Sequence, residues 1–154
     1  MKKSKKYSSK KGKKKVKERV VSYQESILDS LYGMSYEDIE KINLPGKSLT
    51  TIQQQTSLGA MDLAQVMGVS KSTYYNLLDE ETLDSETIDA MVDFAVLWQK
   101  GLEAFDEDAS LLNEWLETRN TNLGGIKPIE LLATRVGRRA LEKAFLRIEY
   151  STYG

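Results

Sequence analysis

The chain has 154 residues, of which 40% are hydrophobic, and such a length and composition can bury one modest core or two small ones. It contains neither cysteine nor histidine, which excludes zinc sites built on these residues, thiol nucleophiles and histidine-based catalytic triads. The formal net charge of −1 hides an asymmetry: residues 1–19 hold eleven cations and one carboxylate, giving +10, so the remainder carries −11.

Residues 1–19 form a lysine-rich segment with too little apolar surface to fold, and we expect a disordered tail. Such a tail can neutralise phosphates and release counterions, which gives sequence-independent affinity for nucleic acid. The alternatives are a solubilising arm, or an arm that lies on the acidic remainder of the chain. No apolar run approaches the roughly 18 residues of a membrane helix, and the N-terminus lacks the apolar centre of a signal peptide. We therefore expect a cytoplasmic protein without membrane contact.

The segment from residue 20 to residue 43 has an amphipathic pattern. Within it, Ser35 and Asp38 resemble a shortened capping box at the start of a second short helix. The segment is either an accessory helical hairpin packed on the core or a dimerisation element. After it, Ser48 is suited to cap a third helix that runs to about residue 57. The apolar face of the first helix is predicted to consist of Ile27, Leu28 and Leu31.

Residues 61–78 have the spacing of a helix-turn-helix. Ala64 is small, as two closely crossing helices require, and Gly68 four residues later accommodates the tight turn. The hydroxyl of Ser70 is suited to cap the second helix. The residues predicted to pack inwards are Leu63, Met67, Val69, Tyr74 and Leu77.

In a DNA-binding interpretation, the second helix of this motif enters the groove, where serine and lysine suit phosphates and asparagine can read a base edge. Only one cation is present there, and residues 79–81 are all acidic and would repel phosphate. DNA binding is therefore expected to be weak and to need two copies of the chain on paired half-sites. The alternative is a helix pair retained as a scaffold without DNA affinity. The candidate DNA contacts are Ser70, Lys71, Ser72, Tyr75 and Asn76.

A central core helix is predicted to follow Asp84 or Ser85, either of which can cap it. Gly101 is expected to loosen its end. The acidic residues 106–108 lack the alternating ligands and the central glycine of a calcium loop, and charge at a helix N-terminus explains them better. The apolar positions of the central helix are Ile88, Met91, Val92, Ala95, Val96 and Trp98, and those of the next are Leu111, Leu112, Trp115 and Leu116.

The sequence from Pro128 onwards predicts two helices separated near Gly137. The last five residues, 150–154, are expected not to continue the helix, and their two tyrosines would suit entry into a cleft. The apolar set of this part is Leu131, Leu132, Val136, Leu141, Phe145 and Ile148.

Several motifs of the last third occur together in a fixed order. They are Trp115-Leu116, Asn120 followed by Leu123-Gly124-Gly125, Pro128 followed by Glu130-Leu131-Leu132, and the closing Arg147-Ile148-Glu149-Tyr150. This combination resembles the C-terminal toxin-binding domain of the Xre-MbcA-ParS antitoxins. The resemblance covers roughly residues 48–153, and Arg119 stands where the family commonly has proline.

The predicted elements and this resemblance imply an all-α fold, with a helical region at 20–101 that contains the helix-turn-helix and a toxin-binding domain at 102–154. The resemblance also implies the antitoxin of a type II toxin–antitoxin pair, without enzymatic activity or cofactor. In the family the usual partner is a RES-domain toxin that depletes NAD, and the antitoxin covers the entrance of its active site. Family members also repress their own promoter as dimers. By motif, the domain-shaping residues are Trp115, Asn120, Leu123, Gly124, Gly125 and Pro128, and the toxin contacts are Arg147, Glu149, Tyr150 and Tyr153.

The alternative is a stand-alone DNA-binding transcriptional regulator that uses the lysine tail for affinity and the helix-turn-helix for selection. Most of the matched motifs lie outside the DNA-binding half, which favours the antitoxin. No cluster of acid, base and nucleophile emerges from the sequence, so an enzyme is the least favoured class.

Overall fold

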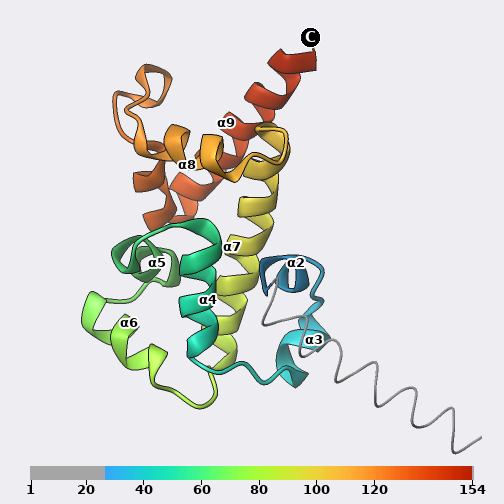
Figure 1. Ribbon diagram of the computed structural model, residues 1–154, viewed down its shortest axis with the longest axis vertical. Coiled ribbons are helices and arrows are strands. Elements are labelled where there is room, and N and C mark those ends of the chain that lie inside the picture. Colours follow the sequence, from blue (N-terminus) through green and yellow to red (C-terminus); the bar gives the residue numbers. More distant parts are fainter. Residues whose placement is uncertain (1–26, 154) are drawn as a thin grey trace, which may run out of the picture.

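The computed structural model describes residues 27–153, with side chains up to Ser151. Within this range every regular element is a helix (Figure 1), which confirms the predicted all-α fold. The predicted tail at 1–19 and the start of the amphipathic segment lie outside the described residues. Along the described part of the chain, every helix falls short of the length or the apolarity that crossing a bilayer requires.

Two short helices begin the described chain, α2 (Ile27–Tyr32) and α3 (Tyr36–Lys41). The predicted capping box is present: the Asp38 N–H donates to Ser35 Oγ at 3.3 Å, and the Ser35 N–H donates to Asp38 Oδ2 at 3.0 Å. Both helices pack against the long helix α7 (Ser85–Ala104), as expected of an accessory element on the core.

The next three helices are α4 (Lys47–Thr56), α5 (Ala60–Met67) and α6 (Lys71–Leu78). The predicted cap of α4 is wrong, because Ser48 is buried inside the first turn and Gly46 occupies the capping position. A Cβ on Gly46 would lie 2.0 Å from the Leu77 carbonyl oxygen at the end of α6. Close packing against the end of α6 therefore leaves no room for a side chain at the start of α4, and no side chain caps this helix.

Four elements complete the chain: α8 (Ala109–Glu117), the 3₁₀ helices η1 (Thr121–Leu123) and η2 (Pro128–Ala133), and α9 (Arg135–Tyr153). The predicted break near Gly137 is wrong, since the chain leaves one helix and enters the next at Thr134 and Gly137 lies inside α9. The predicted non-helical ending is also wrong, because α9 continues to Tyr153.

The central position of α7 agrees with the prediction, and Asp84 caps it by accepting a hydrogen bond from the Thr87 N–H at 2.8 Å. Gly101 does not loosen the end of α7. It is buried, and a Cβ there would lie 3.0 Å from the side chains of both Leu112 and Phe145. The glycine therefore lies where side chains of α8 and α9 pack closely against α7.

One hydrophobic core joins these helices, with α7 as the element common to both ends of the molecule (Figure 1). Buried side chains from 27–101 and from 102–151 belong to the same cluster. Two apolar positions predicted to pack inwards are instead exposed, Leu111 by 47% and Val136 by 75%. The buried stripe of α8 passes through Leu112 and Leu116, and that of α9 through Leu141 and Phe145.

Candidate functional site

Trp115 is a packing residue that ties three helices together. Its ring centroid lies 5.6 Å from that of Phe105, at the end of α7, and 5.5 Å from that of Phe145 on α9. Both separations are typical of favourable aromatic pairs. Asp108 starts α8 by accepting a hydrogen bond from the Leu111 N–H at 3.1 Å. The predicted domain-shaping tryptophan thus sits where α7, α8 and α9 meet.

Asn120 organises the turn between α8 and η2. Its Oδ1 accepts from the Asn122 N–H at 2.8 Å, while its backbone N–H donates to the Ile126 carbonyl at 2.9 Å. Gly124 and Gly125 both have φ of +80°, a region that side chains with a Cβ rarely adopt. The backbone conformation therefore favours glycine at both positions of the motif.

Arg119 and Leu123 complete this turn. The guanidinium of Arg119, in place of the family's common proline, donates to the Gly125 carbonyl at 3.1 Å. Leu123 ends η1 and is half-buried. The arginine thus fastens the turn through a side-chain hydrogen bond.

Pro128 is buried at the first position of η2, where no N–H partner is needed. The Glu130 carboxylate caps the start of η2 by accepting a hydrogen bond from the Lys127 N–H at 3.2 Å. Two buried side chains, Ile129 and Leu132, then anchor η2, which packs against α5, α8 and α9. The short helix therefore links the C-terminal third to the α5–α6 pair.

The start of α9 packs against η2 so closely that there is no space for a side chain at Gly137. A Cβ on Gly137 would lie 2.2 Å from the Leu131 carbonyl oxygen, and the Gly137 N–H donates to Thr134 Oγ1 at 2.9 Å. Arg138 is held within the molecule, because its guanidinium donates to the Leu132 carbonyl at 2.9 Å and pairs with Asp93 at 3.4 Å. Sequence reasoning missed the packing roles of Gly101 and Gly137, since a glycine looks the same at a break and at a close contact.

The predicted toxin contacts lie on the last turns of α9. The side chains of Arg147 and Tyr150 are exposed, and that of Glu149 is half-buried. Tyr153 belongs to the helix, but its side chain lies outside the described side chains. At about 100° per residue, Arg147 and Tyr150 lie about 60° apart around the helix axis, so they occupy neighbouring parts of one surface.

The α5–α6 pair has the local structure expected from the sequence. Gly68 ends α5 with φ of +70°, and Ser70 caps α6 by accepting from the Thr73 N–H at 3.1 Å. Tyr74 is fully buried and donates its hydroxyl to Gln53 Oε1 at 2.7 Å. Burial is the main cause that raises the pKa of Tyr74 to about 12.

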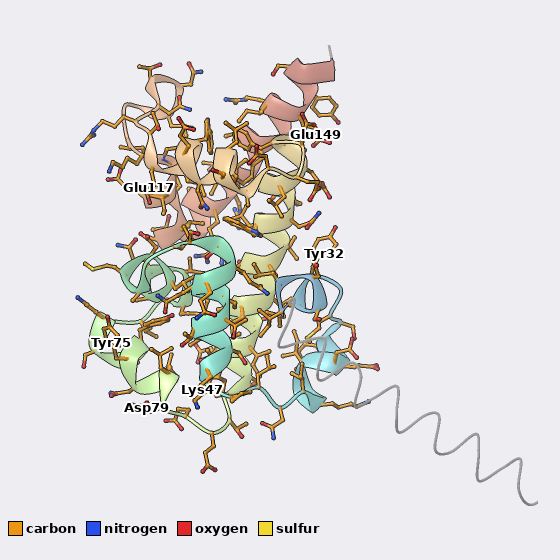
Figure 2. All side chains as sticks on the ribbon, in the orientation of Figure 1. Tyr32, Lys47, Tyr75, Asp79, Glu117 and Glu149 are labelled. Atoms are coloured by element: carbon orange, nitrogen blue, oxygen red, sulfur yellow. The ribbon has the colours of Figure 1, made fainter. Side chains whose placement is uncertain are left out.

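The five candidate DNA contacts form an exposed surface on α6, with Tyr75 on its outer side (Figure 2). The Ser70 hydroxyl is already engaged, because it also donates to Thr73 Oγ1 at 3.0 Å. Lys71 is the one cation of α6, whereas residues 79–81 at its far end are exposed and acidic. The structure brings the five candidate DNA contacts together, but the surface that they form carries little positive charge.

A comparison with known protein families addresses the C-terminal third. Residues 100–150 match the model of the antitoxin Xre/MbcA/ParS C-terminal toxin-binding domain. The resemblance seen in the sequence is thereby confirmed over these residues. No curated protein matches the chain.

The toxin-binding domain begins in the last turns of α7 and contains α8, both 3₁₀ helices and most of α9. Apart from Tyr153, every predicted domain-shaping or toxin-contacting residue falls within it. The match over residues 100–150 supports an antitoxin role for the chain. Among residues 27–151, the side chains of histidine, cysteine, aspartate and glutamate nowhere gather in a group of three or more that suits a metal ion.

Proposed function

We propose that this protein is the antitoxin of a type II toxin–antitoxin pair, and that its C-terminal third binds the toxin and blocks it sterically. The family match over residues 100–150 is the observation that carries this proposal. The domain is built for rigidity, since Trp115, the two positive-φ glycines and Gly137 each have a defined packing or backbone role. A rigid platform loses little conformational entropy when it binds a partner.

The partner that we propose is a RES-domain toxin that consumes NAD, with the antitoxin covering the entrance to its active site. The proposed contacts are Arg147, Glu149, Tyr150 and Tyr153. They stand on the end of α9, which projects beyond the neighbouring helices (Figure 1). A projecting helix end reaches a recessed active site more readily than a flat surface does, so exclusion of substrate is the mechanism that we favour.

The first test is retention of a partner by the full chain. The tagged protein is expressed in its native host, and the retained proteins are identified and quantified. We expect one protein at near-equal stoichiometry, whose expression alone arrests growth and lowers cellular NAD. Recovery of DNA without a protein partner would instead support the stand-alone transcriptional regulator.

The second test separates the proposed contacts from the platform. A chain truncated after Ile148 lacks three of the four contacts but keeps the buried residues of α9. We expect it to retain its helical circular dichroism and to lose protection of cells that express the toxin. Full protection by the truncated chain would exclude the end of α9 as the plug.

We further propose that the α5–α6 pair binds the promoter of the toxin–antitoxin operon when two copies of the chain associate. The exposed α6 surface favours this second role. Replacing Ser72 and Asn76 by alanine should abolish promoter binding in an electrophoretic shift assay without affecting neutralisation of the toxin. Loss of both activities would point to a folding defect, which circular dichroism would detect.

The lysine-rich residues 1–19 are proposed to add sequence-independent affinity for the promoter DNA. Their removal should lower both the affinity and its dependence on salt, because fewer counterions are released on binding. An unchanged slope of log K against log salt concentration would exclude this role. Toxin and promoter are both cytoplasmic, and this is where we propose the protein acts.

A further inference from the structure

The solvent-facing side of α9 has an unusual composition. At about 100° per residue, seven side chains fall within roughly 120° of the helix circumference, opposite the buried stripe through Leu141 and Phe145. We call this surface the outer face of α9. Its cations are Arg135, Arg139, Lys143 and Arg147. Its apolar members are Val136, Leu146 and Tyr150.

No carboxylate lies on the outer face of α9. The two glutamates of the helix, Glu142 and Glu149, lie on its flank, and Glu142 is paired with Lys100 of α7. None of the four cationic side chains makes an ion pair or a hydrogen bond with another residue of the described part of the chain. Each cation is also four residues from the next, a spacing at which like charges on a helix repel. Arg135 and Arg139 line one pocket together with Glu86, Asp89 and Asp93 of α7, whereas Lys143 and Arg147 lie outside it. A negatively charged partner would therefore relieve the repulsion most strongly at Lys143 and Arg147.

The apolar members are strongly exposed for side chains of their type. Val136 is 75% exposed, Tyr150 74% and Leu146 41%. Exposed apolar side chains interleaved with arginine are typical of protein interfaces, which are enriched in tyrosine and arginine. A DNA backbone offers cations their phosphates but gives valine and leucine little to pack against. The mixed composition therefore favours a protein partner with an acidic surface.

We propose that the toxin docks along the whole outer face of α9, through a surface on which carboxylates border an apolar depression. Leu146 and Tyr150 enter the depression, and the four cations pair with the bordering carboxylates. The contact then begins at Arg135 and extends along about 22 Å of helix, well before the end of α9. This inference rests on the antitoxin function proposed above, and it assigns five residues to the interface that the motif comparison does not.

The test uses the full chain and the purified toxin from the retention experiment. The variant R139E/K143E reverses two charges at exposed positions, and K41E/K47E makes the same change in net charge at exposed positions of α3 and α4. We expect R139E/K143E to bind the toxin about 100-fold more weakly, because unlike charges across an interface become like charges. The control should bind as tightly as the wild type.

Three further measurements sharpen the result. The charge-conserving variant R139K/K143R should restore most of the affinity, and L146A should weaken it about tenfold through the lost apolar contact. Wild-type affinity should also fall between 50 and 500 mM salt more steeply than that of R139E/K143E, because salt screens exposed charge pairs. Circular dichroism of each variant verifies that the fold is intact.

Equal toxin affinity for the wild type and R139E/K143E would overturn the inference and leave the proposed antitoxin function standing. Weaker promoter binding by R139E/K143E with unchanged toxin affinity would also overturn it and assign the face to DNA. Failure of the wild-type chain to bind or neutralise any toxin would refute the proposed function itself, and the inference with it.

Discussion

Residues 27–99, which contain the α5–α6 pair, hold twelve carboxylates and three cations and so carry a net charge of −9. Residues 100–150 hold nine carboxylates and eight cations, and their net charge is −1. The two regions share α7 and a single hydrophobic core. Their surfaces nevertheless differ in kind. The candidate DNA-binding helix α6 carries one cation, while α9 presents four on a face without carboxylates.

The difference shows that a local fold and the surface chemistry it presents are independent properties. A helix pair with the spacing of a DNA-binding motif needs positive charge nearby to hold phosphates, and residues 27–99 supply almost none. The proposed promoter contact therefore depends on charge from elsewhere, for which the tail at 1–19 is the candidate. The C-terminal third combines charge and exposed apolar surface on one helix, as a protein interface does.

The largest expected effect tests whether the two regions are one cooperative unit. Leu63 in α5 and Leu141 in α9 are almost fully buried, so L63A and L141A should each lower the free energy of unfolding by about 2–5 kcal/mol. Each should shift the same single transition in urea, followed by circular dichroism and by tryptophan fluorescence. M61A, at a position 59% exposed on α5, should change little. Separate transitions for the two variants would show that the regions unfold independently.

A somewhat smaller effect is expected from glycine packing in the C-terminal third. A Cβ at Gly137 would lie 2.2 Å from a backbone oxygen, so G137A should cost about 1–3 kcal/mol, measured by thermal or urea unfolding. The matched control is G33A, because a Cβ at Gly33 meets no atom within 4 Å. Equal stability of the two variants would contradict the close approach of α9 to η2.

Two aspartate caps allow the regions to be compared with one kind of substitution. D84A removes the cap of α7, D108A removes the cap of α8, and each should cost about 1 kcal/mol in urea unfolding. The hydrogen bond with Thr87 lowers the pKa of Asp84 from its ordinary 3.8. Because the folded-state pKa is the lower one, the charge-dependent part of this stability is present above pH 3.8 and is lost as the pH falls through the depressed pKa.

The control for this pH dependence is D84N, which keeps a capping oxygen without the charge. It should retain most of the stability at neutral pH and lose the acid-dependent difference from the wild type. A pH profile of D84N that follows the wild type in acid would exclude Asp84 as the titrating group.

The smallest effect concerns two strained residues, one in each region. Ser57 after α4 has φ of +59°, and Glu107 before α8 has φ of +64°. Since glycine adopts such angles without steric cost, S57G and E107G should each raise the free energy of unfolding by about 0.5–1 kcal/mol. G124A, the opposite change at φ of +80°, should lower it. Destabilisation by both glycine substitutions would show that the wild-type side chains make compensating contacts.

Most predictions that depended on local chemistry agree with the structure, the cap at Ser48 being the exception. The capping box at Ser35, the caps at Ser70 and Asp84, and the turn at Gly68 each involve residues at most four positions apart. Each of these hydrogen bonds joins groups that are close together in the sequence, so the sequence reveals it. The order of the helices followed from the same signals and from apolar periodicity.

Errors arose where residues far apart in the sequence meet. Ser48 is buried because Gly46 packs on the end of α6, and Gly101 lies inside a helix because α8 and α9 approach it. Val136 was expected inside, yet its neighbour Gly137 is the residue that packs closely on the Leu131 carbonyl, and Val136 is exposed. In each case, two segments distant along the chain determine the role of one residue.

The sequence by itself determined the all-α class, the positions of most helices and the resemblance of the C-terminal third to a known domain family. It did so because apolar periodicity, helix caps and motif order depend on residues that are close together in the sequence. Only the tertiary structure decided that the two regions share one core and that α9 continues to Tyr153 with a cationic, partly apolar outer face. The physical reason is that a side chain becomes buried or exposed through the helices that pack around it, and that packing forms only when the whole chain folds.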